Sequence, residues 1–248
     1  MTLHRSSQPS ALSSQLARRS RAFTLVELLA VVAIIGILAA ILVPTVSSTR
    51  GAANKARTRT QFSQWAAAFE SFRQEYGAYP QLYPQGAQHL VNQNATTTAT
   101  QEHLFHDTLT GHRRDPSGTW PAATNRTPPM PQAQNSRRIQ FVAFTDKDFV
   151  LQADVTNGDN TAAQLNFIRD GFHNTSIAVI TDTNLDGVIN GRDSTGGYPA
   201  VTVAGSTTTI RPTTVAPTGT TGGIHAGVIF YSAPPGASTE ADLIMSWK

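Results

Sequence analysis

The 248-residue sequence contains no cysteine. Without a thiol the chain can form no disulfide, no thiolate metal site and no cysteine nucleophile. Common catalytic patterns are also missing from the sequence: it has no Gly-x-Ser-x-Gly turn, no phosphate-binding loop and no glycine-rich dinucleotide motif. The seven histidines are scattered along the chain. We therefore expect a protein that is not an enzyme.

Acidic residues are absent from the first 22 positions, which hold four arginines and many Ser and Gln residues. Such a segment is typical of a cytoplasmic leader that is not part of the fold. Removing its four arginines leaves 15 basic residues against 16 acidic ones, a net charge near −1 in place of +3. The basic pI therefore comes largely from the leader, and overall charge does not indicate nucleic acid as a partner.

Residues 23–43 form an apolar run of 21 residues with one charge, Glu27. A helix of this length can span the hydrocarbon core of a bilayer. A carboxylate near one end of such a helix costs a few kcal/mol, so it is usually kept only for a partner or a function. An ordinary secretory signal would have a shorter apolar region followed by a small-x-small cleavage site, which this run lacks.

The stretch Arg-Arg-Ser-Arg-Ala followed by Phe-Thr-Leu-Val-Glu resembles the cleavage and methylation segment of type IV pilins and type II secretion pseudopilins. The resemblance implies that a prepilin peptidase cuts between Ala22 and Phe23 and methylates the new N-terminus of Phe23. Glu27 and Pro44 would then be residues five and twenty-two of the mature chain, as is usual in the family. Ala22 stands where the family normally has Gly.

The same resemblance implies how the subunit assembles and where it lies. The ammonium of Phe23 would pair with Glu27 of a neighbouring subunit inside an apolar bundle, because an unpaired charge there is unfavourable. The expected partners are copies of the chain or other pilin-like subunits, prepilin peptidase and an inner-membrane assembly platform. Basic residues flank the run almost equally, so the positive-inside count does not decide orientation. The resemblance places the leader in the cytoplasm and the head in the periplasm or on an extracellular filament.

An aromatic seam continues the helical pattern beyond Pro44. Its members recur at spacings of three and four residues, which places them on one helix face: Phe62, Trp65, Phe69, Phe72 and Tyr76. The pattern predicts one helix from about Phe23 to Tyr76, with a kink or melted turn near Pro44. Gly77 and Pro80 are expected to end it. The phrase Glu-Tyr-Gly-Ala-Tyr-Pro resembles the helix end of pseudopilins.

We expect an α+β protein with the pilin-like fold, in which the long helix packs on an antiparallel β-sheet head. The predicted segments are a leader (1–22), a transmembrane and assembly helix (23–43), its amphipathic continuation (44–80) and a β-rich head with loop insertions (81–248). Strands are predicted from hydrophobic runs bounded by Gly and Asn, at 139–144, 149–153, 176–181, 198–203, 225–232 and 242–247. Residues 206–221 are predicted to be a loop or the end of a wide hairpin.

Residues 81–138 are rich in Gln, Asn, Thr, Pro and Gly and are predicted to be mostly connecting loop, with one short helix near 102–109. That helix carries possible metal ligands three and four residues apart: Glu102, His103, His106 and Asp107. No His-Glu-x-x-His pattern accompanies them. We therefore expect these side chains to lie on the surface.

The twelve residues from Asp182 to Asp193 resemble an EF-hand-like or dockerin-like calcium loop. Calcium prefers six to eight oxygen ligands, and Gly187 at position six would allow the sharp turn. The candidate ligands are Asp182, Asn184, Asp186, the Val188 carbonyl, Asn190 and Asp193. The alternative is a plain turn between strands, because Asn, Asp and Gly also favour turns. A weaker second candidate is Asp154, Asn157 and Asp159.

We conclude from the sequence that the chain is a structural filament subunit. The helix-end phrase and the C-terminal Ser-Trp pair resemble type II secretion pseudopilins more than type IV pilins. Two alternatives stay open. One is a minor pilin at a filament tip that binds DNA or a surface, and the other is a membrane-anchored calcium-binding protein that never polymerises.

Overall fold

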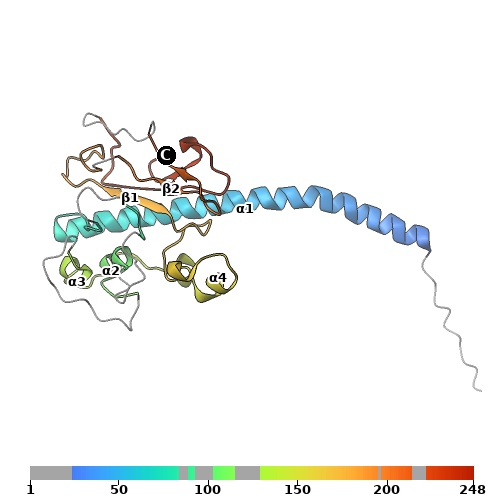
Figure 1. Cartoon of the computed structure of the whole chain (residues 1–248), viewed down its shortest axis with the longest axis horizontal. Helices are drawn as coiled ribbons and strands as arrows, with labels where there is room; N and C mark the ends of the chain where they lie inside the picture. Colours follow the sequence, from blue (N-terminus) through green and yellow to red (C-terminus); the bar gives the residue numbers. More distant parts are fainter. Residues whose placement is uncertain (1–23, 84–88, 93–102, 115–128, 195–196, 214–221) are drawn as a thin grey trace, which may run out of the picture. The chain divides into compact units, whose positions relative to one another are not determined.

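The computed structural model describes residues 24–83, 89–92, 103–114, 129–194, 197–213 and 222–248 (Figure 1). The chain divides into two compact units, residues 1–49 and residues 50–248. One helix, α1 (Leu25–Tyr76), contributes to both units. The side chains at 43–47 of this helix lie outside the described set.

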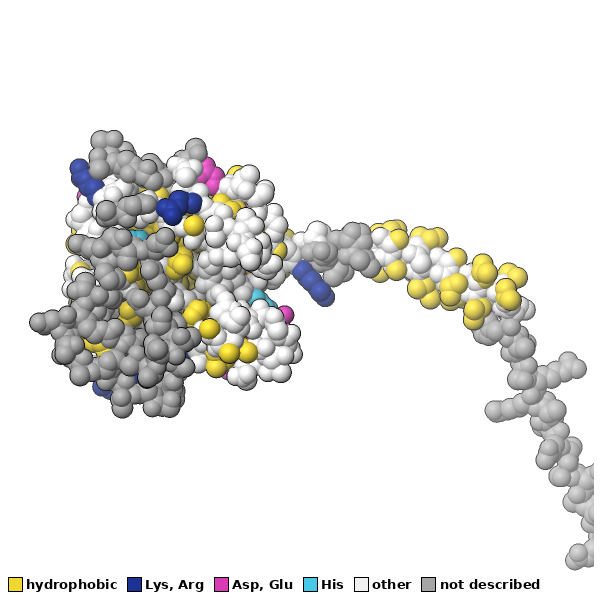
Figure 2. Space-filling view, viewed as in Figure 1, with side chains coloured by type: hydrophobic (Ala, Val, Ile, Leu, Met, Phe, Trp, Pro, Cys, Tyr) yellow, Lys and Arg dark blue, Asp and Glu magenta, His cyan; other side chains and the backbone are white. Residues whose placement is uncertain are grey.

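The first unit holds the apolar part of α1. Residues Leu25–Leu42 form a segment of 18 residues with a mean hydropathy of 2.9, long and apolar enough to cross a membrane. All of its Leu, Ile and Val side chains are exposed within the unit, and they dominate its surface in Figure 2. A continuous apolar surface of this kind is unfavourable in water, so it requires lipid or apolar partners.

The two interruptions predicted for α1 have different outcomes. The helix continues through Pro44, so of the two alternatives predicted there, a kink or a melted turn, the melted turn is not formed. At the other end, Gly77 adopts φ +78° and donates its N–H to the Arg73 carbonyl at 2.8 Å. This left-handed glycine confirms the predicted stop, because only glycine enters that conformation without steric cost.

In the second unit the aromatic seam of α1 packs on the sheet, as predicted. Phe62, Trp65 and Phe69 are at most 2% exposed. Their ring centroids lie 5.5–5.8 Å from that of Phe230 in β4 (Val228–Ser232). Such stacked and edge-to-face contacts add to the stabilisation from burial itself. The periodicity of the sequence therefore located the main core correctly.

The central sheet has the antiparallel order β1-β4-β5, with β1 at Ile177–Thr181 and β5 at Ile244–Met245. Both faces are buried. Val179 and its partner Phe230 face α1, whereas Ile180 and Ile229 belong to a second core. This second core also contains residues of the hairpin formed by β2 (Val201–Thr202) and β3 (Thr209–Ile210). The sheet is thus covered on both sides, and its strands read as continuous apolar runs.

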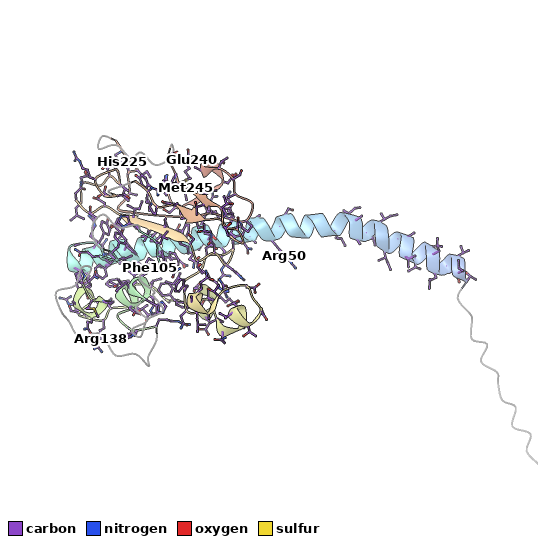
Figure 3. All side chains as sticks on the ribbon, in the orientation of Figure 1. Arg50, Phe105, Arg138, His225, Glu240 and Met245 are labelled. Carbon is purple, nitrogen blue, oxygen red and sulfur yellow. The ribbon has the colours of Figure 1, made fainter. Side chains whose placement is uncertain are left out.

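Short helices lie on the other side of α1 from β1 (Figure 1). Phe105 of α2 (Leu104–Thr110) approaches Trp65 with its ring centroid at 5.0 Å and belongs to the first core. Figure 3 labels one residue of each core, Phe105 of the first core and Met245 of the second. The other short helices in the described segments are α3 (Pro131–Gln134), α4 (Gln152–Thr156) and 3-10 helices at Asp146–Asp148, Ala162–Gln164 and Glu240–Asp242.

Two predicted strands do not form. Residues 139–144 belong to no regular element and form no strand-to-strand hydrogen-bond ladder. Their hydrophobic side chains instead pack on α1, as Phe141 does against Phe72 at 5.3 Å. At 149–153 only Phe149 makes an isolated bridge, to Ile168, and α4 begins at Gln152. Hydrophobic residues bring both segments into the core, but neither gains a partner strand of useful length.

Three buried asparagines tie the loops of the second unit together. The Asn92 amide donates to the carbonyls of Ile168 and Thr175, both at 2.7 Å. Asn135 and Asn174 likewise use both ends of their amides on main-chain groups or a hydroxyl. A buried backbone polar group without a partner would cost about 1–3 kcal/mol, so each asparagine replaces hydrogen bonds that a regular ladder would otherwise supply.

Candidate functional site

The first candidate site is the start of α1, where Thr24 and Glu27 cap the helix. The Thr24 N–H and hydroxyl both donate to Glu27 Oε2 at 2.9 Å. In return the Glu27 N–H donates to Thr24 Oγ1 at 3.2 Å. This reciprocal arrangement is a capping box, which satisfies backbone donors that have no partner in the first turn of a helix.

Sequence reasoning missed this role for Glu27, although the signal was present. Thr24-Leu25-Val26-Glu27 fits the Ser/Thr-x-x-Glu pattern of a capping box. Within the described part of the chain, the hydrogen bonds to the Glu27 carboxylate involve Oε2 only, which leaves Oε1 for a positively charged partner. The cap therefore holds the carboxylate in place without using all of its accepting capacity. The predicted processing residues Ala22 and Phe23 lie outside the described residues.

The second candidate site is the loop that follows β1. Asp182 is 2% exposed and directs its carboxylate back into the loop. Its Oδ2 accepts the Gly187 N–H at 2.7 Å, and its Oδ1 accepts the Asp186 N–H at 3.3 Å. Gly187 has φ +84°, as expected for the sharp turn that the sequence places at this position.

The other predicted ligands close the rest of the loop. Asp186 accepts the Val188 N–H at 2.9 Å and the Asn184 side-chain amide at 2.9 Å. Asp193 accepts the N–H groups of Thr183 at 2.9 Å and Asn190 at 3.0 Å, which joins the two ends of the loop. The structure thus brings five predicted side chains into one closed loop: Asp182, Asn184, Asp186, Asn190 and Asp193.

This loop carries negative charge on its aspartate carboxylates. Asp182 and Asp193 are 2% and 6% exposed, and neither pairs with a basic side chain among the described residues. Burial, and then the charge of Asp193, raises the pKa of Tyr198 to about 12. The ligand atoms predicted for this loop are all oxygens, which suits a hard cation such as calcium. Within the described residues, however, no three Asp, Glu, His or Cys side chains form a converged metal-ligand group.

The weaker second candidate, Asp154 with Asn157 and Asp159, does not form a set of free ligands. Asp154 caps Leu151 with one oxygen at 2.7 Å, and its other oxygen lies 2.9 Å from Arg169 Nη1. Its carboxylate is therefore already committed, while Asn157 ends α4 and Asp159 remains exposed.

The residues near α2 were predicted to be on the surface, and for the described ones this is wrong. Asp107 is 1% exposed, and its Oδ1 lies 2.9 Å from His106 Nδ1 and accepts the Arg114 N–H at 2.8 Å. His103 is 6% exposed, and Glu102 lies outside the described residues. These groups stabilise the packing of α2 against its following turn.

Among the comparisons with known proteins, one family model covers the first candidate site, the start of α1. Residues 17–43 match a family model described as the prokaryotic N-terminal methylation motif. This match covers the basic residues before Phe23, the capping pair and the apolar part of α1 up to Val43. No curated protein and no solved structure matches the chain.

Proposed function

By its N-terminal segment the chain belongs to the prepilin-type proteins, the group of type IV pilins and pseudopilins, and we propose that it is a structural subunit of a pilin-like filament. The proposal rests on one observation above all. The matched segment includes the apolar part of α1, Leu25–Leu42, whose Leu, Ile and Val side chains are all exposed within the first unit. Such a surface can be buried in a membrane before assembly and among copies of itself afterwards.

The proposed mechanism has two steps. A prepilin peptidase cuts between Ala22 and Phe23 and methylates Phe23, which leaves a positively charged amine at the mature N-terminus. This amine then pairs with Glu27 of a neighbouring subunit through the oxygen that the Thr24 cap leaves open. In an apolar bundle an unpaired Glu27 would be strongly unfavourable, so pairing favours the correct register.

Helix packing would complete assembly. Gly36 has no heavy atom within 4 Å of where a Cβ would stand, and Ala39 and Ala40 follow it. Small residues let helix backbones approach closely where no hydrophobic effect favours association. The head would lie in the periplasm or on an extracellular filament, and an inner-membrane platform would drive extraction from the bilayer.

We favour the pseudopilus of a type II secretion system over a type IV pilus. The support is the resemblance of the helix end, Glu75 to Pro80, and of the C-terminal Ser246-Trp247 pair to pseudopilins. The alternatives are a minor tip pilin that binds DNA or a surface and an anchored protein that never polymerises. Loss of secretion in a deletion strain that still forms pili would favour the pseudopilus, whereas loss of pili with normal secretion would contradict it.

The proposal is tested by the intact mass and N-terminal sequence of the protein from its own host's membranes. We expect a chain that begins with N-methylated Phe23. A chain that retains residues 1–22, or that is cut elsewhere, would contradict processing by a prepilin peptidase. An Ala22→Gly variant serves as the reference, since it restores the family's usual residue before the cut.

We also propose that the loop from Asp182 to Asp193 binds calcium. Two observations support this. The candidate ligand atoms of the loop are all oxygens, and the buried carboxylates of Asp182 and Asp193 pair with no basic side chain among the described residues. The ligands would be the side chains of Asp182, Asn184, Asp186, Asn190 and Asp193 with the Val188 carbonyl. A bound cation would offset the cost of burying these charges and would stabilise the loop.

Calorimetric titration of the detergent-solubilised full chain with calcium tests this site. Binding that Asp182→Ala abolishes, and that Asp146→Asn leaves unchanged, would support it. Asp146 is a suitable control because its side chain is 83% exposed and lies in a 3-10 helix outside the loop. A flat titration of the unaltered chain would mean that the loop is a plain turn.

A further inference from the structure

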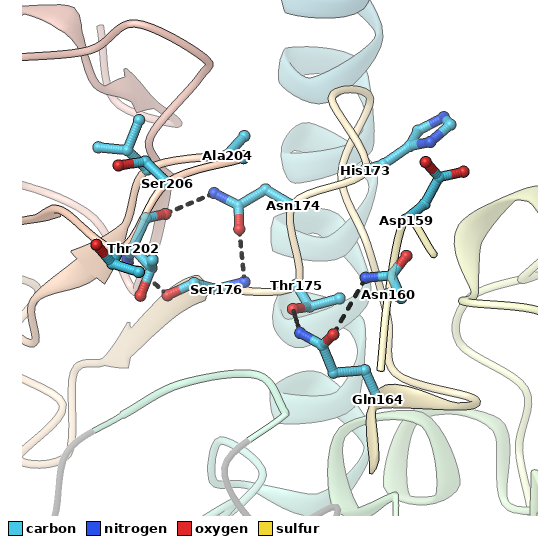
Figure 4. A pocket seen from close by; sticks show the side chains of 13 residues that line it. Asp159, Asn160, Gln164, His173, Asn174, Thr175, Ser176, Thr202, Ala204 and Ser206 are labelled. Carbon is cyan, nitrogen blue, oxygen red and sulfur yellow. Dashed lines mark hydrogen bonds between the residues drawn. The ribbon is translucent and has the colours of Figure 1, made fainter. Parts of the chain in front are cut away.

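A polar cavity of about 630 Å³ lies between two segments that are far apart in the sequence (Figure 4). One wall is formed by residues 159–176, and the other by Thr202 and the turn of the β2-β3 hairpin. Its volume lies within the range of about 300–1,000 Å³ that is typical of small-molecule sites. The family model ends at residue 43, so it does not cover this cavity.

The two walls are held together by hydrogen bonds that are partly buried. The Asn174 amide, 7% exposed, donates to the Thr202 carbonyl at 2.8 Å and to the Ala233 carbonyl at 2.9 Å. The Thr202 N–H donates to Ser176 Oγ at 2.8 Å. The cavity is therefore preformed, and a ligand would not have to order its walls on binding.

Several polar groups of the cavity have no partner among the described residues. The Asp159 carboxylate makes no hydrogen bond or ion pair there, and neither ring nitrogen of His173 is hydrogen-bonded. Asn160 Oδ1 is buried without a partner. The Asn160 amide is held to Gln164 only by a long bond of 3.4 Å, so it can turn toward a ligand. Figure 4 places Asp159 and His173 at the same end of the cavity.

The available groups define the chemistry of a ligand. A carboxylate and an amide oxygen accept hydrogen bonds, and the Ser176 hydroxyl and the His173 ring can do so as well. No lysine or arginine lines the cavity among the described residues, and its few apolar contacts come from Val203 and Ala204. A phosphate or carboxylate would therefore be repelled, whereas a compact ligand rich in hydroxyl and amine donors would be bound.

We propose that this cavity binds an amine-bearing sugar. The sugar hydroxyls would donate to Asn160 and Ser176, and the ammonium would lie beside Asp159. The inference is independent of filament assembly, because it depends only on residues of the second unit.

Saturation-transfer NMR of the full chain tests the proposal, in micelles of a detergent that has no sugar headgroup. The probes are glucosamine, glucose and glucose 6-phosphate at neutral pH. We expect millimolar binding of glucosamine, several-fold weaker binding of glucose and none of glucose 6-phosphate. An equal signal for glucose 6-phosphate, or no signal for glucosamine, would overturn the proposal.

Asp159→Asn provides the matched variant. Its side chain is exposed and without a described partner, so the change should leave the fold intact, which a thermal melt by circular dichroism verifies. We expect glucosamine to bind about three- to fivefold more weakly, with glucose binding unchanged. Asp146→Asn, which removes a carboxylate outside the cavity, should change neither. Equal glucosamine affinity in the two variants would overturn the role assigned to Asp159.

Discussion

At the scale of the residue, the head depends on single polar side chains placed in apolar surroundings. Asn92, Asn135 and Asn174 are each fully used as hydrogen-bond partners. His89 is the opposite case. It is 2% exposed, and its ring is tilted against that of Tyr83 with 3.7 Å between the ring centroids. Neither ring nitrogen has a hydrogen-bond partner among the residues that the structure describes. Burial lowers the pKa of His89 to about 4.

This buried histidine predicts a loss of stability in acid. The unfolded chain takes up a proton on His89 near pH 6.5, but the folded chain does so only near pH 4. The contribution of His89 is therefore complete above pH 6.5 and is lost as the pH falls from 6.5 to about 4. The loss attributable to this residue should be about 2–3 kcal/mol of the free energy of unfolding. Urea unfolding at a series of pH values measures it.

His89→Phe isolates this effect, because Phe keeps a ring against Tyr83 and removes the titrating group. The carboxylates of the head contribute equally to both proteins, so the difference between the two pH profiles reports His89 alone. We expect the variant to lose less stability than the unaltered chain between pH 6.5 and pH 4. Parallel profiles over this range would show that His89 is accessible to protons in the folded state.

At the scale of the element, α1 serves two environments with one continuous helix. The large apolar side chains of its first part, Leu25–Leu42, are all exposed, whereas its aromatic seam is buried in the head. The seam contacts Phe230 in β4 and Phe105 in α2, so one helix face joins the sheet to the short helices. Helix, sheet and α2 therefore share one core and should unfold together.

Trp65 is the residue whose removal should test this shared core. Trp65→Ala leaves a large cavity beside Phe105 and Phe230 and should cost about 3–5 kcal/mol of the free energy of unfolding. Gln64→Ala is the control, since Gln64 is exposed on the same helix turn and should change stability by less than about 0.5 kcal/mol. Thermal melts by circular dichroism compare them. A Trp65 variant as stable as the control would mean that the seam contributes little.

At the scale of the whole molecule, assembly depends on the charge at the start of α1. The capping box gives Glu27 a second role, because its carboxylate also stabilises the helix start. A simple deletion of this side chain would therefore confuse helix capping with charge pairing. The two roles can be separated by substitutions that keep one and remove the other.

Glu27→Gln keeps an oxygen that can accept from Thr24 but removes the charge. Thr24→Ala removes the cap, at a cost of about 1 kcal/mol, but keeps the charge. We expect Glu27→Gln to abolish filament assembly with unchanged membrane insertion, and Thr24→Ala to assemble. Filament yield by electron microscopy and membrane fractionation measure both. Normal assembly of Glu27→Gln would contradict charge pairing with the processed N-terminus.

The sequence by itself determined the features that depend on neighbours along the chain. The N-terminal segment, the membrane-length run, the aromatic seam with its helical period and the stop at Gly77 are all patterns of residues close together in the chain. The strands at 177–181 and 228–232 were also found, because their apolar runs are bounded by turn residues.

Only the tertiary structure decided which segments meet. The apolar runs at 139–144 and 149–153 look like strands, but in the folded chain Phe141 packs against Phe72 of α1 and Phe149 makes only an isolated bridge to Ile168. The burial of both sheet faces, the asparagine ties and the cavity between residues 159–176 and 202–207 all join residues far apart in the chain. Such contacts depend on which surfaces are covered after folding, and no local period in the sequence records them.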